Sequence, residues 1–505
     1  MSTLPDVLIV GTGPTGLVCA LTLAQNGVPV RIIEKLSDYP AGQRGAGIMP
    51  RTLEIYDFLG LLGDVKAAGG PIPEILQYNA EGQPEKVFSI QPYCEPTPAI
   101  PEHNIYMLGQ DAACRILRTH LKKYNIQVEL STELVSFEQH DDHVTVVMKE
   151  QSDAETKSLD VKYLVGADGA KGIVRKVLGL EFLGETRHSM HVLIGDIVVE
   201  GLDNIYWHKF GEIPNDSVMF RPTERYNENI FFIVCSGPTF DYQKALENDE
   251  YLARWIQEVT KRPDLKIVRV EYLADYRPNI RMVNAFQKNR VFVAGGSDAA
   301  HVHSATGGQG MNSSFNLGWK LALVCKRHSP PSLLQSYTEE RLPVIKEMLQ
   351  RTTAILNSTM DPNRKAGDEP WKRPTTLNQL GVHCRWSSIV LNESGASGGG
   401  VPSRDTLATY GAAVCEGDDL RAGDRAPDAP WLIDARTGCT RRLFDMYGPD
   451  HHTVLIFAAH DRDLTPIVQR LACYPNGTVY AVVVYPQGWM KVWPCAVRIP
   501  SSSTG

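Results

Sequence analysis

The beginning of the chain alternates short apolar runs with a helical pattern. Residues 6–10 (DVLIV) form a β-rich apolar run, residues 17–27 (LVCALTLAQNG) place apolar side chains at helical spacing, and residues 28–35 (VPVRIIEK) form a second β-rich run. A strand that is buried on both faces reads as a continuous apolar run. The order therefore predicts a strand, a helix and a second strand of a parallel α/β unit.

Similar runs recur further along the chain. Residues 163–166 (YLVG) and 291–295 (VFVAG) each precede a glycine-rich loop and then a helical pattern. The segment 186–285 contains several strand-like runs, among them SVMFRP and NIFFIVCSG, which predict a second sheet. Residues 330–360 carry a long amphipathic helix pattern, and Pro343 is expected to interrupt that helix.

The pattern changes after residue 360. Residues 361–402 are rich in Pro, Gly and Ser and end in SGASGGGVP, which predicts a flexible linker. Residues 403–505 then contain the strand-like runs HTVLIFAAHD and TVYAVVVYP, separated by segments with loop and helix character. The sequence therefore predicts a separate C-terminal domain with alternating strands and helices.

Composition is ordinary for a globular protein. The 505 residues are 43% hydrophobic and 22% charged, and the formal net charge of −7 gives no reason to expect nucleic acid or an anionic membrane as a partner. No apolar run approaches the ~18 residues of a transmembrane helix, and the N-terminus lacks the basic region of a signal peptide. The 10 cysteines show no CxxC spacing, which favours free thiols over disulfides. We therefore expect a cytoplasmic location.

The loop after the first strand has the glycine spacing GxGxxG. Gly11 permits a tight turn, Gly13 lets the backbone approach a pyrophosphate, and Gly16 lets the helix pack on the strand. Glu34 ends the second strand, where a carboxylate can accept hydrogen bonds from a ribose. Such a carboxylate disfavours a 2′-phosphate, so the pattern predicts bound NAD or FAD rather than NADP.

Two further loops have the composition of a ligand site. Asp168 follows one predicted strand in GADG, so its carboxylate can point toward a ribose hydroxyl or a water on the pyrophosphate. Asp298 follows another, and the glycine-rich residues 307–310 precede a helix, whose exposed N–H groups suit a flat or anionic ligand. Asn312 could bond a ring edge, whereas His301 and His303 lack a third metal ligand and do not predict a metal site.

These three motifs carry a family resemblance. GTGPTG with Glu34, GADGAKGIVRKVLG and AGGSDAAHVHSATGGQGMN resemble, in this order, the signatures of class A FAD-dependent aromatic hydroxylases, typified by para-hydroxybenzoate hydroxylase. GQRGAGIMPRTLEIYDFLGL, LGQDAACRILRTHL and LLQSYTEERLPV are similar to the phenol 2-monooxygenase subgroup, which has a C-terminal thioredoxin-like domain. The resemblance implies an α/β fold with a Rossmann-like FAD-binding domain and an inserted mixed β-sheet substrate domain.

The resemblance also implies domain boundaries. The FAD-binding domain would comprise residues 1–185 and 286–360, and the substrate domain residues 186–285. A linker over 361–402 would lead to the thioredoxin-like domain over 403–505. That last domain lacks CxxC after LIFAA and departs from the family's usual ending, so we expect a packing or dimer module that is incomplete rather than a reductase.

The implied reaction consumes NAD(P)H and O₂. Reduced FAD would form a C4a-hydroperoxide that hydroxylates a phenolic or polyketide-like aromatic, with neither nucleic acid nor membrane as partner and with a homodimer as a compatible assembly. The FAD contacts implied by the resemblance are Gly11, Gly13, Pro14, Thr15, Gly16, Glu34, Lys35, Arg44, Gln110, Asp168, Asp298, Gly308, Gly310, Met311 and Asn312.

The chain also departs from the family pattern. AGGSDAAH replaces AGDAAH, Ala305 replaces a common proline, and about four residues are missing between Ser314 and Phe315. The missing residues amount to about one helical turn of ~3.6 residues, so the helix start should be rotated or shortened. Two alternatives stay open, an FAD-dependent oxidase or dehydrogenase, and a flavin-binding protein whose activity the shortened loop impairs.

The subgroup's catalytic Asp is also missing. Ala46 occupies the corresponding place in the first loop, so we expect a base or a positive field from the middle segment to activate the phenol. The candidates are Tyr276 and Arg221, with His208 as a third.

Overall fold

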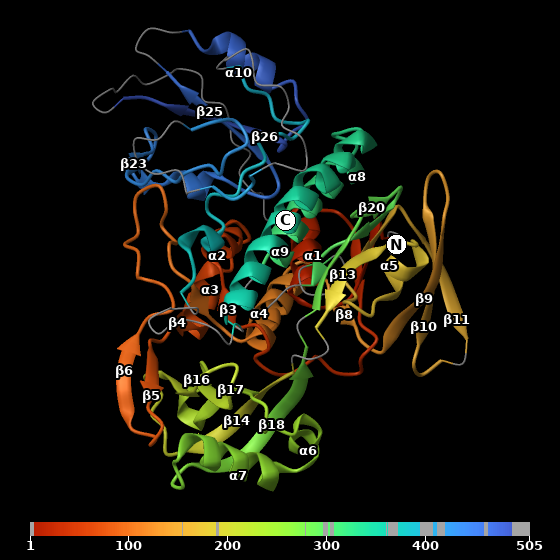
Figure 1. The fold of residues 1–505 in the computed structure, drawn as a ribbon. Coiled ribbons are helices and arrows are strands. Elements are labelled where there is room, and N and C mark those ends of the chain that lie inside the picture. Colours follow the sequence, from red (N-terminus) through yellow and green to blue (C-terminus); the bar gives the residue numbers. More distant parts are fainter. Residues whose placement is uncertain are drawn as a thin grey trace. The chain divides into compact units, whose positions relative to one another are not determined.

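The computed structural model describes residues 5–153, 155–187, 191–277, 279–295, 301–302, 308–359, 361, 372–393, 408–411, 420–458 and 463–486 (Figure 1). The chain divides into two units, Met1–Ala426 and Pro427–Gly505. No helix in the described ranges is long and apolar enough to cross a membrane. The eight cysteines in those ranges are free thiols, as the sequence predicts.

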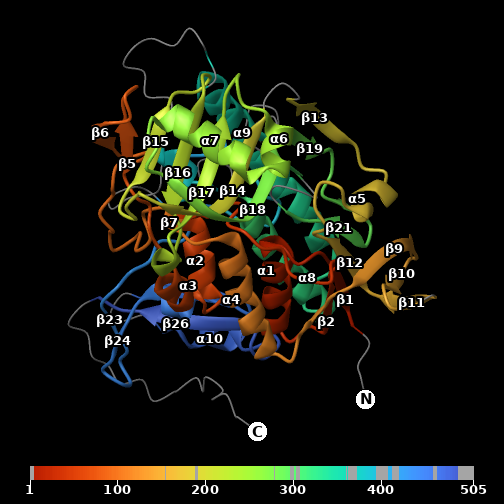
Figure 2. The ribbon, with the colours of Figure 1, turned by 90° about the horizontal axis from the view of Figure 1, so that it is seen from below.

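A six-stranded sheet forms the centre of the first unit. In spatial order its strands are β20 (Gln287–Lys288), β21 (Val291–Val293), β12 (Tyr163–Gly166), β1 (Val7–Val10), β2 (Val30–Ile33) and β8 (Val128–Glu129). The strands from β21 to β8 pair in parallel, and Figure 2 shows β21, β12, β1 and β2 side by side. Because parallel strands end at one edge, the loops that follow them meet there.

A seven-stranded sheet is the second large sheet of this unit. Its strands, in spatial order, are β18 (Lys266–Tyr276), β14 (Val192–Glu200), β17 (Ile230–Ser236), β16 (Ser217–Pro222), β15 (Trp207–Gly211), β5 (Ile75–Tyr78) and β6 (Pro84–Phe88). Helices α6 (Tyr242–Glu247) and α7 (Asp249–Thr260) lie over one face (Figure 2). Phe220, Phe231 and Trp255 belong to the apolar cluster of that covered face.

The opposite face of this sheet, called the inner face below, carries a different set of side chains. Side chains alternate between the two faces of a strand, so Met219 and Arg221 point away from the cluster that contains Phe220. In the same way Phe232 and Val234 point away from the cluster that contains Phe231. The inner face is therefore partly polar and partly apolar.

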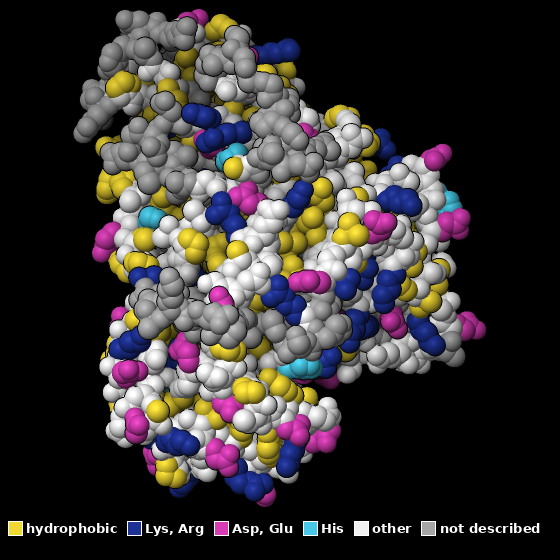
Figure 3. Space-filling view, viewed as in Figure 1, with side chains coloured by type: hydrophobic (Ala, Val, Ile, Leu, Met, Phe, Trp, Pro, Cys, Tyr) yellow, Lys and Arg dark blue, Asp and Glu magenta, His cyan; other side chains and the backbone are white. Residues whose placement is uncertain are grey.

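Three small sheets complete the first unit. They consist of β9 (Thr132–Gln139), β10 (Val144–Glu150) and β11 (Thr156–Val161); of β13 (Phe182–Thr186), β19 (Asn279–Val283) and β22 (His301–Val302); and of β3 (Gly47–Ile48), β7 (Tyr106–Met107) and β4 (Gly70–Pro71). Basic and acidic side chains are interspersed on the face of this unit that Figure 3 shows, in agreement with the modest net charge.

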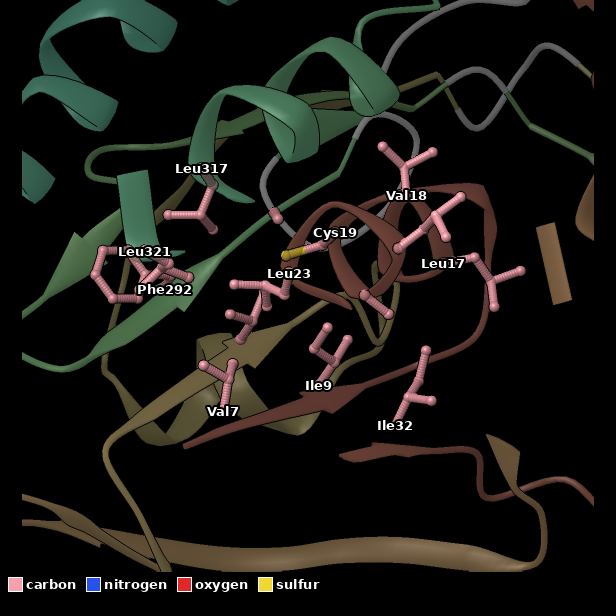
Figure 4. Close-up of a cluster of buried hydrophobic side chains, with 14 of the residues drawn as sticks. Val7, Ile9, Leu17, Val18, Cys19, Leu23, Ile32, Phe292, Leu317 and Leu321 are labelled. Atoms are coloured by element: carbon pink, nitrogen blue, oxygen red, sulfur yellow. The ribbon is translucent and has the colours of Figure 1, made fainter. Parts of the chain in front are cut away.

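Helices pack on the six-stranded sheet. They include α1 (Pro14–Gln25), α2 (Pro50–Phe58), α3 (Leu62–Ala68), α4 (Gln110–Lys122), α5 (Ile173–Val177) and α8 (Gly310–Cys325). Side chains of α1 and α8 meet those of β1, β2 and β21 in one core (Figure 4). α1 and α8 cross closely, because a Cβ on Gly318 would lie only 2.8 Å from the Thr22 Cβ. The strand, helix and strand predicted at the N-terminus are confirmed.

The expected interruption at Pro343 is wrong. After the short helix η2 (Pro331–Leu334), helix α9 runs through Pro343 from Gln335 to Thr359. Proline lacks the N–H that would bond the carbonyl four residues earlier, which belongs to Glu339. The Trp386 indole N–H donates to that Glu339 oxygen at 3.0 Å. A distant side chain thus replaces the missing helical hydrogen bond.

Part of the segment expected to be a linker packs on the first unit. Helix η3 (Thr375–Asn378) lies in it, Leu377 and Leu380 are buried, and the Ser387 hydroxyl donates to the Glu340 carboxylate at 2.7 Å. These contacts explain why the first unit extends to Ala426 instead of ending near residue 360. Composition alone favoured a linker because the packed side chains are few and widely spaced.

The second unit contains a strand, helix and strand. β25 (His452–Phe457) pairs in parallel with β26 (Val479–Val484), and α10 (Thr465–Leu471) lies between them in the chain. β23 (Leu432–Ile433), β24 (Thr440–Arg441) and η4 (Leu443–Met446) precede them. This succession agrees with the predicted alternation of strands and helices, and the thioredoxin-like assignment stays a prediction.

Candidate flavin site

The first two predicted loops and Gly295, where the third begins, meet at the edge where β1, β12 and β21 end. A Cβ on Gly11 would lie 2.2 Å from the Ala167 carbonyl oxygen, so the first loop lies directly against the second. Gly295, after β21, has a φ of +130°. A Cβ placed on Gly295 would lie 3.4 Å from the Thr15 Cγ2 atom, which is ordinary van der Waals contact. The structure therefore brings together motifs that lie more than 100 residues apart in the chain.

The first loop leaves its central backbone open. α1 begins at Pro14, its N-cap residue Gly13 has no side-chain cap, and nothing lies within 4 Å of a Cβ placed on Gly13. Gly16, by contrast, faces the Gly11 carbonyl oxygen, 2.1 Å from an added Cβ. Free N–H groups at a helix start next to an open backbone form a cradle for a pyrophosphate.

Glu34 is held in place at the end of β2. Its carboxylate accepts hydrogen bonds from the Thr12 hydroxyl at 2.8 Å and the Thr12 backbone N–H at 3.2 Å, and its other oxygen accepts from the Leu36 N–H at 3.2 Å. The half-buried carboxylate thus lies beside the glycine loop, where a ribose would bind. Lys35, also predicted to contact FAD, is exposed.

Asp168 presents one bound and one unbound oxygen. Its Oδ2 accepts from the Val174 N–H at the start of α5 at 3.0 Å. Its Oδ1 is buried and has no hydrogen-bond partner among the described residues. Burial raises the pKa of this carboxyl group, and the N–H groups of α5 oppose the shift. A buried acceptor of this kind is costly unless a ligand hydroxyl satisfies it.

Gln110 lies close to the loop that carries Arg44, and the prediction that both residues contact FAD stays a prediction. The Gln110 side-chain oxygen is 3.9 Å from a Cβ placed on Gly45, the neighbour of Arg44. Gln110 begins α4, and its N–H donates to the Gln43 carbonyl at 3.2 Å. Arg44 is exposed, has a φ of +43°, and lies 5.7 Å from the Tyr272 ring. Its guanidinium is therefore open to a phosphate.

The described residues at the start of α8 are also polar and glycine-rich. Gly308 has a φ of +64°, and α8 begins at Gly310 without interruption at the shortened stretch. The Asn312 amide donates to Gln379 Oε1 at 2.7 Å and to Gln309 Oε1 at 3.2 Å, whereas its own oxygen is buried without a partner in the described ranges.

Two further side chains make contacts near the start of α8, the predicted FAD contact Met311 and the unpredicted Gln379. The Met311 sulfur accepts from the Tyr56 hydroxyl at 2.9 Å and thus points into the core. The Gln379 amide also donates to the Gly308 carbonyl at 3.3 Å. Gln379 was not predicted, because it lies in no motif and its partners are about 70 residues away in the chain.

Some predicted residues cannot be placed. Asp298, Ala305 and His303 lie outside the described residues, as does the His301 side chain. Among the residues that the structure describes, no group of three or more His, Cys, Asp or Glu side chains could hold a metal ion.

A buried polar network joins the Arg44 loop to the inner face. Arg221 donates to the Gln43 side-chain oxygen at 3.0 Å, and the Gln43 amide donates to both Glu224 oxygens at 2.8 and 3.0 Å. The Gln43 backbone N–H donates to Asp196 Oδ2 at 2.8 Å. Asp196, Phe232 and Arg221 are register neighbours on β14, β17 and β16. Neither Gln43 nor Asp196 was predicted, because only the folded sheet brings them to Arg221.

Burial dominates the electrostatics of this network. It lowers the pKa of Arg221 to about 10, although Glu224 and Asp196 oppose the shift. It raises the pKa of Asp196 to about 6, although the Gln43 N–H and Arg221 favour the charged form. The Asp196 Oδ1 is buried without a partner in the part of the chain described. In the structure Arg221 holds the Gln43 side chain in place through its hydrogen bond to the Gln43 oxygen.

The structure does not bring the catalytic candidates together. Tyr276 ends β18, and two strands, β14 and β17, separate β18 from Arg221 on β16, which is about 14 Å at ~4.8 Å per strand. His208 is fully buried, bonded to the Tyr78 hydroxyl and to the Asp203 carbonyl at 2.9 Å each. Tyr78 belongs to the cluster on the covered face, so His208 lies on the side away from the inner face.

The converged loops and the Glu34 carboxylate define a dinucleotide-binding flavoprotein fold. Residues 5–352 match the family described as FAD binding domain. A flavin-dependent monooxygenase of Mycobacteroides abscessus is 33% identical over 497 residues, which cover 96% of each chain. Pentachlorophenol 4-monooxygenase of Sphingobium chlorophenolicum is 28% identical over 499 residues, covering 95% of this chain and 86% of that one. The chain therefore belongs to the FAD-binding-domain family, as a class A FAD-dependent aromatic monooxygenase.

Solved structures show the same fold. A ternary complex of aklavinone-11 hydroxylase with FAD and aklavinone superimposes with a TM-score of 0.75 at 25% identity, covering 96% of this chain and 89% of that one. The flavin-dependent monooxygenase PieE, in complex with FAD and substrate, gives a TM-score of 0.78 at 21% identity, with coverage of 96% and 90%. The Rossmann-like FAD-binding fold predicted from the sequence is confirmed.

The residues at the loop junction fit FAD. The open Gly13 backbone suits a pyrophosphate, and Glu34 can accept from ribose hydroxyls. The buried Asp168 and Asn312 oxygens lack partners within the described ranges, as expected for groups that a cofactor satisfies.

Proposed function

We propose that the chain hydroxylates the ring of a phenolic substrate, with NAD(P)H as reductant and O₂ as oxidant. FAD would supply the chemistry, accepting hydride from NAD(P)H and activating O₂. Gly11, Gly13 and Gly16 would hold its pyrophosphate, and Glu34 and Asp168 its hydroxyl groups. The similarity to pentachlorophenol 4-monooxygenase and to aklavinone-11 hydroxylase supports the substrate class.

One observation carries the proposal. The Arg44 loop, which we expect to border the flavin, is tied to the inner face of the seven-stranded sheet by Gln43. An aromatic substrate bound over the inner face would then lie near the flavin. Arg221, fixed by Gln43, would add a positive field that favours a phenolate over a phenol, whose pKa is ordinarily about 10.

The test starts from purified full-length protein. We expect a flavin absorbance spectrum, NAD(P)H oxidation that rises on addition of phenols, and a product heavier by one oxygen atom. NAD(P)H oxidation that yields only hydrogen peroxide or a dehydrogenated product would instead identify an oxidase or dehydrogenase. Protein with FAD that no aromatic compound stimulates would indicate a flavin-binding protein without hydroxylase activity.

A pair of glycine variants separates cofactor binding from folding. Gly13→Ala adds a methyl group where the protein has open space but where the pyrophosphate would lie. Gly63→Ala adds one in α3, also with nothing within 4 Å, but away from the loops. We expect loss of FAD and activity only in Gly13→Ala.

A further inference from the structure

The inner face has an apolar region beyond the Arg221 network. Ile194, Val234 and Met219 are register neighbours across β14, β17 and β16, two residues along from Asp196 and Arg221. Ile75, Ile90 and Met219 form one buried cluster there, with Trp207 and Val234 packed against it. From β14 to β5 the sheet spans four strand spacings, about 19 Å, enough for a multi-ring aromatic molecule.

Two polar side chains in this apolar region have unsatisfied donors. Gln91, next to Ile90, is 8% exposed, and its amide nitrogen is buried without a hydrogen-bond partner among the described residues. The indole nitrogen of Trp207, whose side chain packs on the cluster, is likewise buried and unpaired within those ranges. Leaving a buried donor unsatisfied costs about 1–3 kcal/mol, so a ligand acceptor bound at this place would gain from both groups.

The backbone of Arg373 lies beside the same apolar region. The Arg373 backbone N–H donates to the Ile90 carbonyl at 3.1 Å, which fixes Arg373 beside Ile90 and Gln91. Burial lowers the pKa of its guanidinium to about 10, and no carboxylate of the described residues opposes that shift. The residue as a whole is nevertheless not fully buried. A guanidinium inside the protein without a carboxylate partner is suited to accept a bidentate anionic ligand.

The other buried cations described on this face have partners. Lys209 is paired with the Glu212 carboxylate, and Arg221 is bonded to Gln43, whereas Lys86 is exposed and lies over the Phe88 ring. Arg373 differs from Lys209 and Arg221 in having no such partner within the described residues.

Arg373 also belongs to the segment that reaches the flavin-facing loop. Gln379, six residues later, bonds the Gly308 carbonyl and Asn312. Six residues span at most about 20 Å when extended, and the helix η3 between them shortens the path. A substrate whose ring lies at the start of α8 can thus reach Arg373 with its far end.

We propose that Arg373, Gln91 and Trp207 form an anchoring subsite for a carboxylate carried by the aromatic substrate. The guanidinium fork matches a carboxylate in two parallel hydrogen bonds, and the amide and indole N–H groups can donate to the remaining lone pairs. The guanidinium and the indole offer only donors, and the unpartnered Gln91 atom is its amide nitrogen, which favours an anionic acceptor over a neutral hydroxyl. This inference rests on the proposed function, since it names the class of substrate for the same site.

Binding measurements on the full chain loaded with FAD test the subsite directly. The probes are 4-hydroxybenzoate and 6-hydroxy-2-naphthoate, each paired with its methyl ester, and the readout is the change in flavin absorbance on titration. We expect the wild type to bind each acid more tightly than its ester. Arg373→Met should weaken acid binding by roughly 10- to 100-fold and leave ester binding nearly unchanged.

Two further variants separate recognition from folding. Arg373→Lys keeps the charge but loses the fork, so it should recover part of the preference for the acids. Arg254→Met removes an exposed arginine of α7, on the covered face of the same sheet, and should leave the preference intact. FAD content and thermal unfolding are recorded for each variant, since a structural role would weaken acid and ester binding alike.

Each possible outcome either supports or rejects the carboxylate subsite. A preference for the acids that disappears in Arg373→Met supports the subsite. Absence of binding by all probes, equal affinity for acid and ester in the wild type, or an unchanged preference in Arg373→Met overturns it. Hydroxylation of the esters alone would leave the proposed function standing and reject the subsite, whereas acid binding without any oxygenated product would do the reverse.

Discussion

Arg221 donates a hydrogen bond to the Gln43 side-chain oxygen at 3.0 Å, although 178 residues separate the two in the chain. Through this bond a strand of the seven-stranded sheet holds the loop that carries Arg44. Gln43 in turn donates hydrogen bonds to Glu224 and Asp196. The position of the flavin-side loop is thus set by the sheet over which we expect the substrate to bind.

Replacing Arg221 by Met should destabilise the protein by about 1–3 kcal/mol, because the buried Gln43 side-chain oxygen loses its charged donor and the buried Asp196 loses a nearby cation. It should also weaken FAD binding, since Gln43 loses the donor that orients it. Urea unfolding and flavin titration measure the two effects. The control Arg254→Met, at an exposed position, should change stability by less than about 1 kcal/mol. Similar losses in both variants would contradict an anchoring role for Arg221.

Asp196 should make stability depend on pH in a defined window. Its folded pKa of about 6 lies above the ordinary value of 3.8, so the folded state binds more protons between these values. Stability therefore falls as pH rises through this window, by about 2–3 kcal/mol in total for this group. Asp196→Asn keeps an acceptor for the Gln43 N–H and should remove this dependence.

The comparison of the two proteins isolates Asp196 from other carboxyl groups. Urea unfolding at pH 4 and pH 7.5 should show that Asp196→Asn gains stability relative to the wild type at the higher pH. A difference between the two proteins that is equal at both pH values would show that the Asp196 pKa is not raised on folding.

Gly11→Ala should behave differently from Gly13→Ala. A Cβ on Gly11 would collide with backbone, 2.2 Å from the Ala167 oxygen, at a φ of +103° that disfavours L side chains. We expect loss of folding, seen as a lower melting temperature of the FAD-free protein. Gly13→Ala should melt near the wild type but bind FAD weakly. If both variants melt like the wild type, the two loops are not in contact.

Trp386→Phe should destabilise the first unit by about 1–2 kcal/mol, because the Glu339 carbonyl loses the donor that replaces the one missing at Pro343. In the double variant with Pro343→Ala the helix supplies its own N–H, so the cost of Trp386→Phe should shrink. A double-mutant cycle by urea unfolding measures this coupling. Strict additivity of the two substitutions would rule out the exchange of donors.

Apolar runs and glycine spacing in the sequence predicted the strands and loops that depend mainly on neighbouring residues. The strands at residues 7–10, 30–33 and 163–166, and the glycine loops after them, follow from apolar runs and from backbone freedom at Gly11. The same signals are shared with the family, which is why the flavin-binding fold was recognised. The roles assigned to the individual FAD contacts, and those of Tyr276 and Arg221, stay predictions.

Long-range partners could not be predicted in this way. Gln379 and Gln43 carry no motif, and their importance arises only when distant segments pack together. Continuation of α9 through Pro343 depends on Trp386, 47 residues from Glu339. Likewise the composition of 361–402 gave no sign that Leu377, Leu380 and Ser387 pack on the first unit.

The meeting of three distant loops also sets an order of events during synthesis of the protein. A nascent chain that has been synthesised as far as Gly169 contains the first two loops, but Gly295 and Gly308 follow more than 100 residues later. The coenzyme can therefore be captured completely only after most of the first unit has left the ribosome. Chains that end before Gly295 should therefore bind FAD more weakly than the full chain.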